Sequence, residues 1–199
     1  MSPISRREFV IAGAAAGTGL VLWFYLPHGG RNPGAGAFAP NAYLRIAPDG
    51  KITVVVARSQ MGQGVQTSLP MILAEELEAD WSQITIEQAG ASTLFGDQTT
   101  GGSASVKTTW RPMRQAGAAA REMLIAAAAL EWGVQSSLCN ADKGAVVHGA
   151  SSRRLSYGEL AEKAAKLPVP ANQQMKSAKD FKLIGVRTPR TDTPSKVDG

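Results

Sequence analysis

Residues 61–124 read MGQGVQTSLPMILAEELEADWSQITIEQAGASTLFGDQTTGGSASVKTTWRPMRQAGAAAREML, and the chain is organised around them. They open on a glycine-bearing turn, residues 61–67 (MGQGVQT), and a second one, residues 99–105 (TTGGSAS), follows later. The pattern of a helix comes after each turn. Glycine turns that lead into helices present backbone N–H groups to anionic or polar ligands. We therefore expect the two turns to form two walls of one cofactor site.

The first helix is expected to begin at Thr67, a good N-cap residue, with Pro70 in the first turn, where a missing N–H costs little. One of its carboxylates, Glu76, lies on the apolar arc of the helix, whereas Glu75 and Glu78 lie off that arc. A carboxylate on an apolar face is paired, reaches the edge of that face, or serves a function. For Glu76 we favour a structural ion pair.

Strand patterns lie before and between the helices. Alternating apolar residues on both sides of Asp49-Gly50 predict a hairpin over residues 42–57. Residues 81–89 predict a strand that turns Ile84 and Ile86 inward. The expected fold class is α+β, with a small mixed or antiparallel sheet and two main helices packed on it.

The second helix is rich in alanine, and its start has two interpretations. It begins either at Ser105, with a kink at Pro112, or at Thr109. Residues 116–132 are helical on propensity alone, and Gly133 is expected to end the helix.

The remaining chain contains weaker local signals. Residues 139–149 predict a short hairpin, with Cys139 as a small buried residue and His148 as an exposed polar residue at a turn. Residues 156–159 (SYGE) resemble a capping box that opens a short helix. From residue 167 onward several prolines indicate an extended, mostly irregular segment.

The side-chain inventory excludes several kinds of site. With Cys139 as the only cysteine, the chain has no internal disulfide, no cysteine-ligated iron–sulfur cluster and no Cys-rich zinc site. Two histidines, His28 and His148, are too few for a His-rich metal site, and we assign no metal ligand. The net charge of +5 is too small and too scattered to indicate nucleic-acid binding. Chemistry must rest on a bound cofactor, on carboxylates or on another chain.

The N-terminus carries an export pattern. Residues 5–10 (SRREFV) place two arginines before an apolar Gly/Ala-rich run over residues 10–26. This predicts a twin-arginine signal peptide over residues 1–37, with a cleavage site at residues 35–37, and a periplasmic location. An uncleaved leader that anchors the chain in the membrane is the alternative.

A series of motifs in this chain resembles a known family. The resemblance is to the N-terminal part of the molybdopterin-binding beta subunits of isoquinoline 1-oxidoreductase type, in the xanthine dehydrogenase and aldehyde oxidase family. It spans nearly the whole chain. The motifs that carry it are the arginine pair, residues 61–67, 74–81 (AEELEADW), 100–105, 115–124 (QAGAAAREML), 155–160 (LSYGEL) and 189–199 (PRTDTPSKVDG).

The resemblance implies a molybdenum hydroxylase that oxidises N-heterocycles or aldehydes. Its cofactor would be molybdenum-molybdopterin, commonly in the cytosine dinucleotide form. Electrons would leave through an iron–sulfur subunit, with a cytochrome c as a candidate acceptor. The family's cofactor-contacting turns match Gly62, Gln63 and Gly64 in the first motif, and Gly101, Gly102, Ser103 and Ser105 in the second.

One family feature has no match in these residues. The glutamate that acts as the catalytic base lies in a later half of such proteins, so we assign no catalytic residue. We expect residues 38–166 to be a partial molybdopterin-binding domain and residues 167–199 an extended linker toward an absent hammerhead-like domain. The remaining half of the site would come from another chain. The alternative hypothesis is a non-catalytic remnant or scaffold module that keeps the fold without activity.

Overall fold

The computed structural model describes residues 20–25, 40–95 and 97–197. The strands are β1 (Leu20–Tyr25), β2 (Pro40–Ile46), β3 (Ile52–Val56), β4 (Ile84–Gln88), β5 (Cys139–Asp142), β6 (Ala145–His148) and β7 (Arg153–Ser156). The α-helices are α2 (Val65–Leu77), α3 (Ser105–Trp132), α4 (Tyr157–Ala165) and α5 (Pro194–Val197). Short 3-10 helices are η1 (Trp81–Gln83), η2 (Thr93–Phe95), η3 (Ser136–Leu138), η4 (Gly149–Ser151) and η5 (Ala178–Asp180).

The main sheet is mixed, with the strand order β1-β2-β3-β4. The predicted hairpin is confirmed, since β2 and β3 pair antiparallel with Leu44 opposite Val54. Gly50 takes a positive φ of 86° in the connecting turn, a conformation that glycine adopts without strain. The strand predicted over residues 81–89 is confirmed only from Ile84 to Gln88, as β4, since residues 81–83 form η1. β4 runs parallel to β3, with Ile84 and Ile86 packed against the core.

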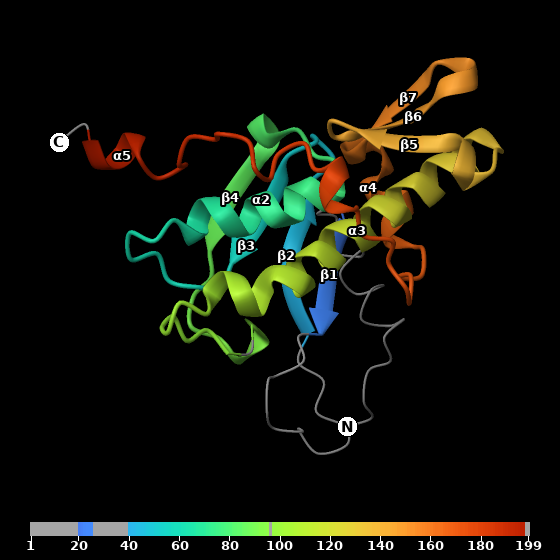
Figure 1. Ribbon diagram of the computed structural model, residues 1–199. Coiled ribbons are helices and arrows are strands. Elements are labelled where there is room, and N and C mark those ends of the chain that lie inside the picture. Colours follow the sequence, from blue (N-terminus) through green and yellow to red (C-terminus); the bar gives the residue numbers. More distant parts are fainter. Residues whose placement is uncertain (1–19, 26–39, 96, 198–199) are drawn as a thin grey trace, which may run out of the picture.

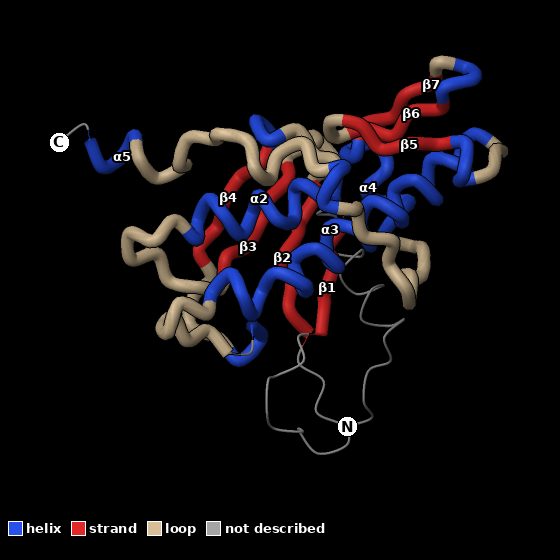
Figure 2. The backbone as a smooth tube through the Cα atoms, viewed as in Figure 1, coloured by secondary structure: helices blue, strands red, loops and turns tan. Residues whose placement is uncertain are grey.

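Helices α2 and α3 lie side by side across one face of the main sheet (Figure 1). The tube view shows the same two layers, with strands behind helices (Figure 2). The α+β fold expected from the sequence is therefore confirmed. The core between the layers includes Leu44, Ile46, Ile52, Val54, Val56, Leu69, Leu73, Leu77, Met113, Ala116, Ala120, Met123 and Leu124.

The start of α2 differs from the prediction. The helix begins at Val65, after Gly64 in the left-handed conformation, and not at Thr67. The carbonyl of Gly64 accepts the N–H groups of Thr67 and Ser68, so the first turn is already formed where a Thr67 cap was expected. For α3 the structure decides between the two interpretations in favour of Ser105, and the helix continues through Pro112.

The predicted ion pair of Glu76 is confirmed. Its carboxylate is completely buried, lying 2.6 Å from the Arg114 guanidinium and 3.3 Å from that of Arg121. It also accepts the backbone N–H of Lys176 at 2.9 Å. One carboxylate on α2 therefore joins α3 and the C-terminal segment.

Glu75, which lies off the core-facing arc as predicted, is nevertheless buried, because the C-terminal segment covers it. Its carboxylate accepts the backbone N–H groups of Lys182, Leu183 and Ile184 at 2.7–3.1 Å. It also pairs with the Lys176 ammonium. The C-terminal segment is irregular, as the sequence suggested, but it is bonded to α2 and α3; its role as a linker stays a prediction.

Acid should weaken this attachment through Glu75. Burial alone would raise the pKa of Glu75, but the Lys176 ammonium and the three backbone amides hold the pKa below its ordinary value of 4.5. The stabilising contribution of an ionised carboxylate with a lowered pKa is complete above about pH 5 and is lost as the pH falls through the folded-state pKa.

We expect Glu75→Gln to have a lower free energy of unfolding than the native chain at neutral pH. This difference in free energy should shrink as the pH falls below about 5. Urea unfolding at a series of pH values measures it. Glu87→Gln, in an exposed pair with Arg45, is the control and should leave the pH dependence unchanged. A gap for Glu75→Gln that stays constant from pH 7 to about pH 3 would contradict the expectation.

The second sheet has the order β5-β6-β7 and confirms the predicted hairpin. The capping box is also confirmed: Ser156 Oγ accepts the N–H of Glu159, whose carboxylate accepts the Ser156 N–H. Cys139 is buried as predicted. The prediction for His148 is wrong, because β6 turns it toward Trp132 and its Nδ1 lies 2.7 Å from Ser151 Oγ.

Part of the predicted export signal falls in a strand. β1 lies within residues 1–37 and pairs antiparallel with β2. The arginine pair at residues 6 and 7 and the cleavage site at residues 35–37 lie outside the described residues, so the export signal stays a prediction. None of the helices in the described ranges has the length and apolar character that crossing a membrane requires.

Candidate functional site

The structure brings the two glycine turns together beyond the carboxyl end of β3. The first turn connects β3 to α2, and the second precedes α3. The backbone N–H of Ser59 donates to Thr100 Oγ1 at 2.9 Å, which joins the two loops directly. Both loops lie at the same end of the helix layer, on the left of Figure 1. The two loops are therefore neighbours in space, and the cofactor-binding role of their residues stays a prediction.

Arg58 precedes the first turn in the chain, and its side chain contacts the loop that carries the second turn; it was not singled out from the sequence. Only 6% of the residue is exposed. Its guanidinium donates to the backbone carbonyl of Thr99 and, at 3.1 Å, to Thr108 Oγ1. Asp97 lies 3.7 Å from Nη1, on the exposed side. The signal that could have identified Arg58 is its position, a cation directly after a fully buried strand and before a glycine turn.

The charge of Arg58 affects the surroundings of the site. Burial raises the pKa of the Tyr43 hydroxyl, and the nearby Arg58 cation opposes that effect. A guanidinium with little access to water keeps its field, because little solvent screens it. The Asp97 carboxylate, 3.7 Å away, offsets part of this charge.

The first turn is shaped by two glycines and one amide side chain. Gly62 and Gly64 have φ angles of 101° and 86°, where other residues are strained. The Gln63 side chain folds back, donating to the Ser59 carbonyl at 2.8 Å and accepting the Met61 N–H at 2.6 Å. In this structure Gln63 thus braces its own turn, and the backbone of the turn faces outward.

The second turn exposes three of its four predicted residues. Gly101, Gly102 and Ser103 are exposed, and the last two have φ angles of 58° and 55°. A positive φ is uncommon for a serine and marks a turn held by its surroundings. Ser105 differs, since it is buried at the start of α3 and its carbonyl accepts the Thr109 hydroxyl at 2.7 Å.

These glycines leave room for a ligand. A Cβ atom added at Gly62, Gly101 or Gly102 would meet no heavy atom within 4 Å. One added at Gly64 would lie 3.9 Å from Arg190 Cζ. Exposed backbone N–H groups and serine hydroxyls can donate hydrogen bonds to a phosphate or to the amide edge of a planar ring, and glycines leave space for such a ligand to approach. The residues present therefore fit the pterin cofactor that the sequence motifs imply.

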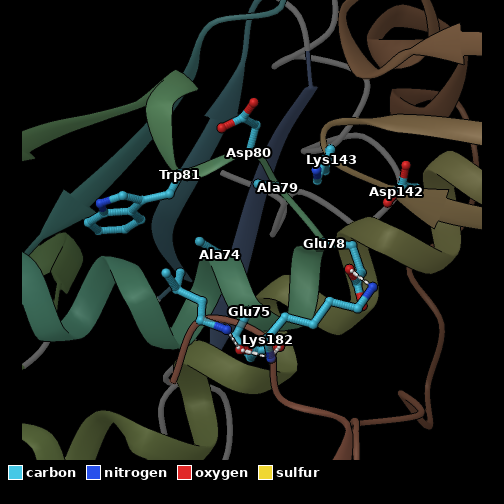
Figure 3. Close-up of a pocket in the computed structure, with 10 residues that line it drawn as sticks. Ala74, Glu75, Glu78, Ala79, Asp80, Trp81, Asp142, Lys143 and Lys182 are labelled. Carbon is cyan, nitrogen blue, oxygen red and sulfur yellow. Dashed lines mark hydrogen bonds and ion pairs between the residues drawn. The ribbon is translucent and has the colours of Figure 1, made fainter. Parts of the chain in front are cut away.

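A separate cavity of about 320 Å³ lies at the other end of α2 (Figure 3). It is lined by residues that include Glu75, Glu78, Asp80, Asp142 and Lys182. Its charges already have protein partners: Lys182 pairs with Glu78 at 2.8 Å, and the Ser82 hydroxyl and amide hold the pKa of Asp80 below its usual range. This cavity is distinct from the glycine turns.

Comparison with protein families decides the classification. Residues 5–196 match the model of the molybdopterin cofactor-binding domain. This chain belongs to that family. The matched range includes both glycine turns and the C-terminal segment that covers α2.

Two curated relatives are similar over most of this chain. It is 34% identical to the membrane-bound aldehyde dehydrogenase [pyrroloquinoline-quinone] of Gluconacetobacter polyoxogenes, over 98% of this chain and 27% of the relative. It is 32% identical to the beta subunit of the isoquinoline 1-oxidoreductase of Brevundimonas diminuta, over 84% of this chain and 26% of the relative. The chain thus spans about a quarter of the length of these relatives.

A solved structure shares the fold. The Cu,Mo-CO dehydrogenase in its carbon-monoxide-reduced state superposes with a TM-score of 0.50 at 22% sequence identity, covering 73% of this chain and 19% of that chain. At this identity the likeness concerns the fold alone. It supports the arrangement of a small mixed sheet covered by two helices.

Proposed function

We propose that this chain supplies one wall of the molybdopterin site in a molybdenum hydroxylase that oxidises N-heterocycles or aldehydes. The observation that carries the proposal is the junction of the two glycine turns, linked by the bond between Ser59 and Thr100 and by the side chain of Arg58. Membership of the molybdopterin cofactor-binding family supplies the identity of the group.

The proposed roles follow from the geometry of each turn. The open backbone at Gly62, Gly64, Gly101 and Gly102 would bind the amide edge of the pterin and a phosphate, with the Ser103 hydroxyl as a further donor. Gln63 would hold the first turn in shape, by way of the bonds that it makes to Ser59 and Met61, and Ser105 would bind from the start of α3.

The charge of Arg58 would favour the anionic phosphate of a dinucleotide, and we propose the cytosine dinucleotide form. When bound, the cofactor supplies the molybdenum at which substrate is oxidised. The residues of this chain bind and orient it. We assign no metal ligand among them, which suits a cofactor that brings its own sulfur ligands.

The base glutamate and the electron-transfer groups are proposed to lie elsewhere in the enzyme. Two relatives are themselves named as single subunits, one of the isoquinoline 1-oxidoreductase and one of the nicotinate dehydrogenase of Pseudomonas putida. We propose a heteromeric complex in which an iron–sulfur subunit and an acceptor such as a cytochrome c complete the enzyme. Export to the periplasm by the twin-arginine route is part of this proposal.

One relative's name contains a different cofactor, pyrroloquinoline quinone. We favour molybdopterin for this chain because the family match extends over residues 5–196 and because the open turns suit an amide-edged pterin with a phosphate.

Metal and pterin analysis of the assembled complex tests the proposed function. The chain is expressed with the neighbouring subunits in its native host and purified through a tag on a partner. We expect molybdenum and a pterin in near-equal amounts with this chain, and cytidine monophosphate after mild acid hydrolysis. An assembled complex without molybdenum or pterin would contradict the proposal and favour a scaffold module.

A further inference from the structure

The C-terminal segment returns to the first glycine turn after it has passed along α2. Three consecutive residues, Arg190, Thr191 and Asp192, contact this region. In Figure 1 the segment runs beside α2 toward the end of the helix that carries the turn. These contacts join residues that are more than 120 positions apart in the chain.

Arg190 is held in one orientation by a carboxylate. Its Nε and Nη2 donate to the two oxygens of Asp192 at 3.0 and 2.9 Å, a two-point contact that fixes the plane of the guanidinium. Asp192 is itself buried, and it also accepts from Gln60 Nε2 at 2.7 Å and from the Lys196 ammonium. The guanidinium of Arg190 and the ammonium of Lys196 hold the pKa of Asp192 well below its usual range.

The guanidinium of Arg190 contacts the first turn at its two glycines. Nη1 of Arg190 donates to the Gly62 carbonyl at 2.8 Å, and Cζ lies close to Gly64. Just beyond the turn, Thr67 Oγ1 accepts the Thr191 N–H at 3.0 Å. The turn is thus held before, within and after its glycines by three successive residues of the C-terminal segment.

We propose that Arg190 is a positioning residue of the cofactor site, which Asp192 orients so that it fixes the turn of Gly62 to Gly64 in the shape that receives the pterin. Glycines have the largest backbone freedom of any residue, so a turn built on two of them needs an external clamp to be preorganised. The segment from Arg190 to Lys196 is then part of the site. This inference rests on the proposed function.

Hydrogen exchange on the full chain, followed by mass spectrometry, tests the clamp without any cofactor. In Arg190→Ala, peptides that cover residues 59–68 should exchange about tenfold faster, as expected for the loss of roughly one charge-assisted hydrogen bond, while peptides within α3 stay unchanged. Arg190→Lys keeps the positive charge but cannot make the two-point contact of a guanidinium with Asp192. Its exchange rate over residues 59–68 should therefore lie between those of the native chain and Arg190→Ala. Arg154→Ala is the control, because Arg154 is similarly exposed and also pairs with an aspartate, Asp142.

The same variants in the assembled complex test the link to the cofactor. We expect Arg190→Ala to reduce the molybdenum and pterin content about tenfold, by the same loss of turn order, and Arg154→Ala to leave it unchanged. Unchanged exchange over residues 59–68, or faster exchange spread equally over α3, overturns the clamp. Faster local exchange with full cofactor content overturns the positioning role. A native complex that itself lacks molybdenum refutes the proposed function, and the exchange experiment then still decides whether the clamp exists.

Discussion

Glu76→Ala is expected to lower the free energy of unfolding by about 3–5 kcal/mol, the range found when one partner of a buried ion pair is removed. The carboxylate has no exposed surface, and the side chains of Arg114 and Arg121 are only 15% and 13% exposed. Its loss leaves the Lys176 N–H without this acceptor and the two guanidinium groups without their carboxylate partner, although backbone carbonyls still accept from both. The cost should therefore come mainly from desolvated cations that have lost their counter-charge.

Urea unfolding followed by circular dichroism measures this difference. Glu87→Ala is the matched control, because Glu87 pairs with Arg45 at 2.8 Å in a position where both side chains are about half exposed. Exposed pairs contribute about 0–1 kcal/mol, so the control should remain near the native value. Equal effects of the two substitutions would contradict the structural role of Glu76.

Gly117→Ala should have the second largest effect on stability, about 1–3 kcal/mol, as for other side chains forced into a packed contact. Gly117 lies where α3 crosses α2. An added Cβ would lie 2.4 Å from the Leu73 carbonyl oxygen and 2.8 Å from Glu76 Cβ. The two helices would have to move apart, since backbone atoms cannot turn away as a flexible side chain can.

Helix propensity makes this prediction sharper. In an isolated helix, replacing glycine by alanine should stabilise the helix by about 1 kcal/mol. A net loss of stability in Gly117→Ala can therefore come only from the contact between α2 and α3. The reverse exchange at a half-buried position of α3, Ala126→Gly, should cost about 1 kcal/mol through propensity. Thermal and urea unfolding of both variants provide the comparison. A Gly117→Ala chain as stable as the native one would show that the helices do not approach as closely as described.

The elements that were predicted correctly depend on local signals. The hairpin of β2 and β3 follows from the turn residues Asp49 and Gly50. The capping box needs only Ser156 and Glu159, and Gly133 ends α3 because it adopts the left-handed conformation. Glu76 was assigned to an ion pair because a carboxylate on an apolar arc has few other ways to be buried. In each case the physical cause lies within a few residues of the effect.

The features that were missed depend on contacts between distant residues. His148 was expected to be exposed, because nothing in its own segment shows that Trp132, at the end of α3, would lie against it. Thr67 resembles a helix cap, yet Gly64 already starts the helix, and the Thr67 hydroxyl accepts from Thr191 instead. A pattern along one segment carries no information about which other segment will pack on it.

The candidate site was predicted in part for the same reason. The glycines were identified by their motifs, and their residue types already imply turns. Arg58 lies outside the quoted motifs, and Arg190 lies in one, residues 189–199, that gave no sign of a contact with the first turn. Their roles depend on Thr99 and Gly62, in loops far from them in sequence. The structure thus adds the residues that hold the turns in place.

The most direct test of the proposed site is the cofactor content of a complex that carries Gly101→Leu. Gly101 has an ordinary backbone conformation and open space at its Cβ position, so the chain itself should tolerate a larger side chain there. Gly149 in η4 has the same two properties but lies in the connection between β6 and β7, which makes Gly149→Leu the matched control.

Molybdenum and pterin are measured in each purified complex, together with the melting temperature. If the two turns hold the cofactor, Gly101→Leu lowers its content by about tenfold or more, corresponding to at least about 1.4 kcal/mol of binding, while Gly149→Leu keeps full content and both melt like the native complex. Full cofactor content in the Gly101→Leu complex would contradict the central claim that these glycine turns form the wall of the molybdopterin site.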